Sequence, residues 1–275
     1  YYISPKVWAW NQSRAWHLKA NVDRMFVILP FEKEFFKKFD WEVDYVGNPV
    51  LDAVKSFEPN VNFMSDKKIA GSSPLIALLP GSRKQEVLRI VPVMREVITR
   101  FPDLQFAVAT VNNLDPGLYS PLAALPNVRL VEEDTYNLLS NAHAAIVTSG
   151  TATLETALFK VPQIVVYRAA TLTVALVRRI IKVKFISLVN LIAGREVVKE
   201  LIQDGANAET LSNELKAIVA NGIYRKTMLD EYDRIMKMLD TGSASENAGR
   251  LMVEALRGYG VTPQPINPST HQHNS

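Results

Sequence analysis

Two short segments combine small residues with charged side chains in a pattern that suits nucleotide binding. Residues 78–83 read LLPGSR, and residues 149–155 read SGTATLE. Each segment follows an apolar, strand-like run and precedes a helix-like pattern, so each is expected to form a turn between a strand and a helix. In an open parallel sheet such turns lie at the carboxyl ends of the strands, where ligands bind.

The residue types in these turns indicate which ligand they suit. Glycine at positions 81 and 150 lets the backbone approach a ligand closely, and the start of the following helix attracts phosphate. Arg83 adds a planar fork of donors that matches phosphate oxygens. Glu155 adds a carboxylate that can accept hydrogen bonds from sugar hydroxyls. Together the turns predict a nucleotide or nucleotide-sugar site.

A simpler interpretation of the same turns stays open. Turns of glycine and serine before helices are common in α/β proteins, and Ser82 or Ser149 can serve only as helix caps. Neither turn is a Walker A motif or a G-x-G-x-x-G fingerprint. Two such turns with an arginine and a glutamate nonetheless favour the functional interpretation over the structural one.

Composition places the chain among ordinary globular proteins. It has 275 residues, 48% hydrophobic and 21% charged, which is enough to bury a core. The net charge of +3 and the absence of cysteine argue against a nucleic-acid partner, a disulfide framework and thiolate chemistry. We also expect neither a metal site nor a cofactor. A homodimer is compatible with the sequence.

The order of expected elements predicts an α/β fold with two Rossmann-like domains. Residues 1–52 resemble the latter part of one domain, and because Tyr1 opens on a strand-like run, we expect that domain to be truncated. Residues 53–73 are expected to be a linker. Residues 74–240 alternate strands with helices, which predicts a doubly wound parallel sheet. Residues 241–257 are expected to form a helix that returns to the first domain, and residues 258–275 a disordered tail.

After the strand expected at residues 163–167 the pattern predicts helices only, at residues 172–183, 194–204, 208–220, 224–239 and 244–257. The first of these is amphipathic and basic. Leu172, Leu176 and Ile180 repeat at helical spacing. The polar side carries Arg178, Arg179, Lys182 and Lys184 and no acid. Such a helix suits an anionic membrane surface; the alternative is a helix that packs on the sheet with an exposed basic edge.

Five segments occurring together and in order resemble the lipid-A-disaccharide synthase family, inverting glycosyltransferases of the two-domain type B fold. They are residues 2–10 (YISPKVWAW), 29–32 (LPFE), 79–83 (LPGSR), 149–155 (SGTATLE) and 190–196 (NLIAGRE). The resemblance runs from residue 1 to about residue 257. It implies metal-independent transfer of 2,3-diacylglucosamine from UDP-2,3-diacylglucosamine to 2,3-diacylglucosamine 1-phosphate, with release of UDP. It also implies a cytoplasmic enzyme, peripheral on the inner face of the inner membrane of Gram-negative bacteria.

The resemblance and the turn chemistry together assign residues to roles. Arg83 and Arg195 are expected to stabilise the leaving diphosphate. The expected substrate-binding residues are Gly81, Ser82, Arg83, Ser149, Gly150, Thr151, Thr153, Glu155, Asn190, Arg195 and Glu196. The alternative for Arg195 is a surface arginine paired with Glu196 or Glu200.

Two departures from the family bear on these assignments. This chain has Leu188-Val189-Asn190 where the family usually has Leu-Pro-Asn, which loosens the turn but keeps the asparagine. The family's candidate general base corresponds to a position upstream of Tyr1, so this chain alone is expected to be inactive in transfer. Two other functions stay open: a UDP-sugar epimerase of the same fold, and a non-catalytic nucleotide-binding domain.

Overall fold

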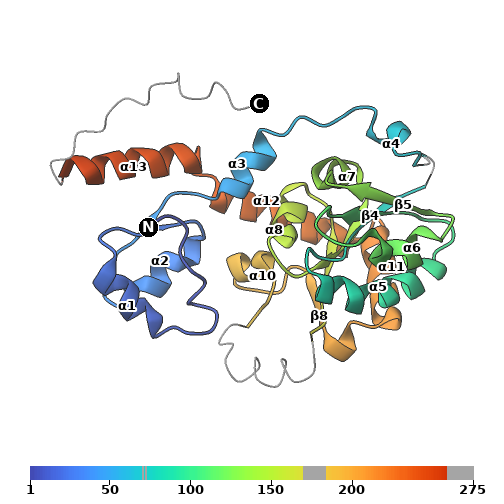
Figure 1. Ribbon diagram of the computed structural model, residues 1–275, viewed down its shortest axis with the longest axis horizontal. Coiled ribbons are helices and arrows are strands. Elements are labelled where there is room, and N and C mark those ends of the chain that lie inside the picture. The colour runs from blue at the N-terminus through green and yellow to red at the C-terminus, as the bar shows by residue number, and fades with distance from the viewer. Residues whose placement is uncertain (70, 72, 170–183, 259–275) are drawn as a thin grey trace.

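The computed structural model describes residues 1–69, 71, 73–169 and 184–258 (Figure 1). The chain forms a smaller N-terminal part and a larger α/β part built around one sheet. The C-terminal helix lies beside the smaller part rather than on the larger one (Figure 1). The chain therefore passes between the two parts twice.

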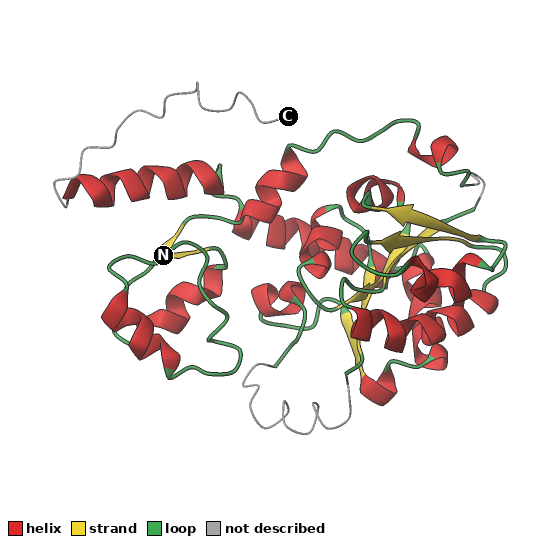
Figure 2. Cartoon of the chain, in the orientation of Figure 1, coloured by secondary structure: helices red, strands yellow, loops and turns green. Residues whose placement is uncertain are grey.

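The larger part is a six-stranded, fully parallel sheet (Figure 2). Its strands are β3 (Leu75–Leu79), β4 (Gln105–Thr110), β5 (Val128–Glu132), β6 (Ala144–Thr148), β7 (Gln163–Tyr167) and β8 (Lys199–Ile202). They are ordered β5-β4-β3-β6-β7-β8. The chain reverses its direction of travel across the sheet between β3 and β6, and such a switch point opens a crevice at the carboxyl ends of the strands.

The central strands are apolar on both faces because helices cover both. Every residue of β3 is buried, and alternate side chains enter two different clusters, as the two-residue period of a strand requires. The surrounding helices are α5 (Lys84–Thr99), α6 (Ser120–Ala123), α7 (Thr135–Asn141), α8 (Ala152–Leu158), α10 (Leu188–Ala193), α11 (Ala208–Val219) and α12 (Ile223–Leu239). Continuous apolar runs of this kind are typical of parallel sheets.

The smaller part contains short helices and a two-stranded parallel sheet. Its elements are α1 (Arg14–Asn21), β1 (Phe26–Val27), α2 (Pro30–Lys37), β2 (Asp44–Tyr45), α3 (Pro49–Lys55) and α13 (Ala244–Gly258), and α4 (Phe63–Asp66) follows on the way to β3. Glu32 is buried and accepts hydrogen bonds from the backbone amides of Ile28 and Leu29 at 3.1 and 2.9 Å. These contacts fix the start of α2. The expected linker at residues 53–73 contains the end of α3 and all of α4.

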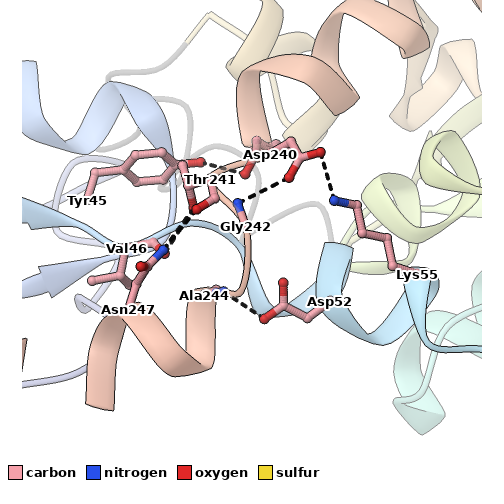
Figure 3. Close-up of polar contacts among 10 residues, drawn as sticks. Tyr45, Val46, Asp52, Lys55, Asp240, Thr241, Gly242, Ala244 and Asn247 are labelled. Atoms are coloured by element: carbon pink, nitrogen blue, oxygen red, sulfur yellow. Dashed lines mark hydrogen bonds and ion pairs between the residues drawn. The ribbon is translucent and has the colours of Figure 1, made fainter. Parts of the chain in front are cut away.

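Polar contacts join the two crossing segments where the parts meet (Figure 3). The Lys55 ammonium lies 2.7 Å from the Asp240 carboxylate. The Asp52 carboxylate accepts a hydrogen bond from the backbone amide of Ala244 at 2.8 Å, at the start of α13. Ala248 on α13 then packs with Phe26 in a small apolar cluster. The first contact joins α3 to the end of α12, and the other two tie α13 to the N-terminal part.

One expected helix is wrong. Residues 194–204 do not form one α-helix, because α10 ends at Ala193 before Gly194 with φ +68°, residues 199–202 form β8, and a short 3-10 helix begins at Gln203. β8 extends the sheet by pairing with β7. β8 reads Lys199-Glu200-Leu201-Ile202, and this pairing of two charged with two apolar residues fits a helical pattern as well as it fits a partly exposed edge strand. The basic helix expected at residues 172–183 and residues 259–275 of the tail lie outside the described residues.

Candidate functional site

A cavity of about 620 Å³ lies at the switch point of the sheet, and both turns singled out from the sequence line it. Its volume falls within the range of small-molecule sites, roughly 300–1,000 Å³. Gly81, Ser82 and Arg83 contribute from the first turn. Ser149, Gly150 and Thr151 contribute from the second turn. The two segments, about 70 residues apart in the chain, thus meet in one site.

The first turn holds an arginine that is free to reach a ligand. Gly81 has φ +102°, and a Cβ there would lie 2.5 Å from an oxygen of Glu86, so glycine is required. Arg83 is the N-cap residue of α5, and its side chain is 83% exposed. Its contact with Glu86 measures 3.4 Å, a weak surface pair. A phosphate can therefore recruit Arg83 at little cost.

The second turn is held by its own side chains. The Ser149 hydroxyl donates to the carbonyl of Ile186 at 3.1 Å. Thr153 is buried, and its hydroxyl donates to the carbonyl of Gly150 at 2.8 Å. Thr153 therefore shapes the turn without lining the cavity. The N-cap residue of α8 is Thr151, and neither Ser82 nor Ser149 caps a helix.

Glu155 reaches the cavity from α8 and is joined there by a tyrosine that the sequence analysis missed. The Tyr136 hydroxyl donates to the Glu155 carboxylate at 3.2 Å. Burial raises the pKa of Glu155, and this hydrogen bond opposes the shift. Burial, with the nearby Glu155 charge, raises the pKa of Tyr136 to about 12. Tyr136 packs edge-on against Phe57 and Phe159, so the acceptor atoms of Glu155 are held in place.

Lys6 is a second residue that the sequence analysis did not assign to the site. Among the described residues of the N-terminal part it alone lines the cavity. Its neighbours Val7 and Trp8 are buried, and the Trp8 indole donates to the Glu32 carboxylate at 3.1 Å. Burial raises the pKa of Glu32 to about 7 against the effect of its hydrogen bonds and of Lys6. The turn that carries Lys6 is thus anchored, and both parts of the fold contribute to one cavity.

Besides Thr153, three residues expected in the site lie outside the cavity lining. Asn190, Arg195 and Glu196 do not line the cavity. Arg195 lies in the loop between α10 and β8 rather than at a helix start, and it pairs with Glu231. Glu196 pairs instead with Lys199 at 3.3 Å. The partner of Arg195 is thus a residue of α12, which the sequence spacing did not reveal.

Asn190 is buried and engaged within the protein. Its amide oxygen accepts from the backbone amides of Val197 and Val198 at 2.7 and 3.0 Å. Its amide nitrogen donates to the carbonyl of Val198 and to the Glu200 carboxylate, both at 2.9 Å. In the structure Asn190 therefore positions the loop before β8.

A comparison with protein families decides the assignment of the chain. The model of the lipid-A-disaccharide synthetase family matches residues 1–252. The chain belongs to this family. It is therefore a glycosyltransferase-family chain of lipid A biosynthesis, as the five sequence segments indicated.

Curated relatives of this synthetase chain agree with the assignment. It is 38% identical over 264 residues to the lipid-A-disaccharide synthase of Syntrophus aciditrophicus (strain SB). That match covers 94% of this chain and 69% of the relative. It is 33% identical to the synthase of Geobacter sulfurreducens, covering 93% of this chain and 68% of the relative. These relatives do not favour the epimerase alternative.

Solved structures show that the synthetase chain has the type B glycosyltransferase fold. A UDP-GlcNAc 2-epimerase from Neisseria meningitidis, bound to UDP-GlcNAc, superposes with a TM-score of 0.59 at 17% identity. This match covers 89% of this chain and 67% of the epimerase. The calicheamicin glycosyltransferase CalG4 superposes with a TM-score of 0.55 at 19% identity, covering 87% of this chain and 55% of that one. At these identities the likeness concerns the fold alone.

Two further observations concern membrane-spanning helices and metal sites in the described residues. The part that the structure describes contains no helix long and apolar enough to cross a membrane. In the same residues no group of three or more histidine, cysteine, aspartate or glutamate side chains is arranged to hold a metal ion.

Proposed function

We propose that the cavity holds the UDP portion of UDP-2,3-diacylglucosamine, and that the sugar is transferred from it to 2,3-diacylglucosamine 1-phosphate. The observation that carries this proposal is the meeting of two phosphate-suited turns, Arg83 and Glu155 in one cavity at the switch point. The family assignment supplies the substrates. The lining of the cavity supports a position for the diphosphate at the first turn and for the ribose at Glu155.

The leaving diphosphate is stabilised by the first turn. As the bond between the anomeric carbon and the diphosphate breaks, negative charge grows on the departing UDP. Arg83 and the backbone amides at the start of α5 oppose this charge. A hydrogen bond to a charged group contributes roughly 1.5–3 kcal/mol. We leave Arg195 out of this role because its guanidinium is engaged by Glu231.

The ribose is held by Glu155. Its carboxylate accepts one hydrogen bond from Tyr136 and has lone pairs left for two sugar hydroxyls. Because burial raises its pKa, protonation at low pH removes part of this acceptor capacity. The position of Glu155 in the first turn of α8 keeps it beside Ser149, Gly150 and Thr151.

The N-terminal part faces the acceptor. Lys6 brings a positive charge to the cavity from that part, and the acceptor carries a phosphate. During transfer the acceptor hydroxyl loses its proton to a general base, and its oxygen forms the new glycosidic bond as UDP leaves. By resemblance, the base lies in the family segment that precedes the part matched by this chain.

The site of action is proposed to be the cytoplasmic face of the inner membrane. The support is the sequence of residues 172–184, whose apolar residues recur at helical spacing beside four basic side chains and no acid. Both substrates carry acyl chains, so an enzyme at an anionic lipid surface meets them where they reside.

Product analysis by mass spectrometry tests the proposed reaction. The chain, and the chain extended by the upstream segment of its relatives, are each supplied with UDP-2,3-diacylglucosamine and the acceptor. We expect disaccharide and UDP from the extended protein and negligible disaccharide from the 275-residue chain. Robust transfer by the shorter chain would place the base within it. Epimerised UDP-sugar, or binding without turnover in the extended protein, would contradict the proposal.

A further inference from the structure

Thr148, a residue that lines the cavity, carries a buried hydroxyl with no hydrogen-bond partner among the described residues. Thr148 is the last residue of β6 and is only 6% exposed, and its Oγ1 atom is buried without a partner. The residue nevertheless lines the cavity. A buried polar group left unpaired destabilises the protein, so the hydroxyl calls for a partner that the described residues do not supply.

The position of Thr148 in the sheet places it between the two turns. Val147 is in register with Leu79 of β3, and Thr148 itself is in register with Val166 of β7. Thr148 therefore lies where β3 gives way to Pro80 and the first turn, and it directly precedes the second turn. This is the switch point, where ligands enter open parallel sheets.

Nearby threonines show that an unpaired hydroxyl is not a general feature of this region. The Thr153 hydroxyl donates to Gly150 at 2.8 Å, and the Thr156 hydroxyl donates to Ala152 at 2.7 Å. Two other buried side-chain atoms without partners in the described part, on Tyr119 and Gln163, belong to residues that do not line the cavity. Thr148 thus combines an unpaired hydroxyl with a place in the site.

We propose that the Thr148 hydroxyl is a further ligand-binding group, which donates a hydrogen bond to an oxygen of the diphosphate. This inference rests on the proposed function. An anionic oxygen is the strongest acceptor such a ligand offers, and a charge-assisted bond is shorter and stronger than a neutral one. The cost of the unpaired hydroxyl in the free protein is relieved when the diphosphate binds between the two turns.

The substitution Thr148→Val tests this directly because valine keeps the side-chain shape and removes the hydroxyl. We expect opposite changes in two measurements. The thermal unfolding midpoint of the free protein should rise by about 2–4 °C, because an unsatisfied group has been removed. The affinity for UDP, measured by calorimetry, should fall about tenfold. The affinity for uridine should change little. Thr148→Ser, which restores a hydroxyl, should recover most of the UDP affinity.

Thr156→Val is the matched control. It removes a buried hydroxyl that already has a partner, so the unfolding midpoint should fall and UDP affinity should stay at the parent value. The inference is overturned if Thr148→Val binds UDP as tightly as the parent, or if uridine binding falls as much as UDP binding. If the parent itself fails to bind UDP, the proposed function fails. Parent-like binding by Thr148→Val alone removes only the role of Thr148.

Discussion

Asn190→Ala is expected to destabilise the fold and to have little effect on the affinity for UDP. Asn190 is fully buried and makes four side-chain hydrogen bonds, of 2.7 to 3.0 Å, to the segment from Val197 to Glu200. Those bonds connect α10 to the start of β8 at the edge of the sheet. Alanine removes all four hydrogen bonds. Water cannot take their place unless the loop opens.

The magnitude follows from the groups left behind. The backbone amides of Val197 and Val198, both buried, lose their acceptor. Each unsatisfied buried donor costs about 1–3 kcal/mol. The free energy of unfolding should therefore fall by about 2–6 kcal/mol, in the upper range for single substitutions. The loss of the contact with Glu200 adds to this, because that carboxylate also holds the backbone amides of Ile186 and Ser187.

Urea denaturation measures the loss, and calorimetry with UDP shows whether binding changes with it. Asn141→Ala is the control, since Asn141 is exposed and its amide makes only local hydrogen bonds, to the Asn137 carbonyl at 2.9 Å and the Ser140 hydroxyl at 3.3 Å. That variant should lose less than about 0.5 kcal/mol. The reasoning is refuted if Asn190→Ala keeps parent stability but loses UDP affinity, which would make Asn190 a ligand contact as the family resemblance implies.

Three further predictions concern charge. Glu155→Ala should weaken the binding of UDP and spare the binding of pyrophosphate, and equal losses for both ligands in calorimetry would indicate a structural role. In the parent, UDP affinity should fall on acidification, because the protonated carboxyl accepts hydrogen bonds less well. The pKa of Glu32 rises from 4.5 to about 7 on folding, so the folded state binds its proton more tightly and the free energy of unfolding should fall by about 3 kcal/mol as pH rises from 4.5 to 7. Urea denaturation across this range should show this decrease in the free energy of unfolding in the parent and not in Glu32→Gln. The same dependence of the free energy of unfolding on pH in both proteins would contradict the prediction. Reversal of Arg178, Arg179 and Lys182 to glutamate should reduce sedimentation with anionic vesicles, most clearly at low salt, and parent-like sedimentation would assign the segment to packing instead.

The strands and turns that frame the site were predictable because their signals are local. The side chains of the apolar run at residues 75–79 are all buried only if the strand lies in a sheet covered on both faces. Glycine at position 81 marks the turn that follows. The same reasoning located the turn at residues 149–151. These features depend on neighbouring residues in the chain, and the sequence carries that information directly.

The parts of the site that were missed depend on tertiary contacts. Tyr136 precedes Glu155 by 19 residues, and nothing in the spacing indicates that their side chains meet. Lys6 reaches the cavity from the other part of the fold. Asn190 was assigned to the ligand through the family resemblance, whereas in the structure its buried amide oxygen accepts from the backbone just before the next strand.

The binding of UDP by this chain tests the central claim most directly. Isothermal titration calorimetry should be run on the parent, on Arg83→Ala and on Arg250→Ala, whose arginine is also exposed and paired along a helix, at 2.9 Å from Glu254. We predict that the parent binds UDP, that Arg83→Ala binds it about tenfold more weakly, and that Arg250→Ala matches the parent. No UDP binding by the folded parent, or unchanged affinity in folded Arg83→Ala, would contradict the account.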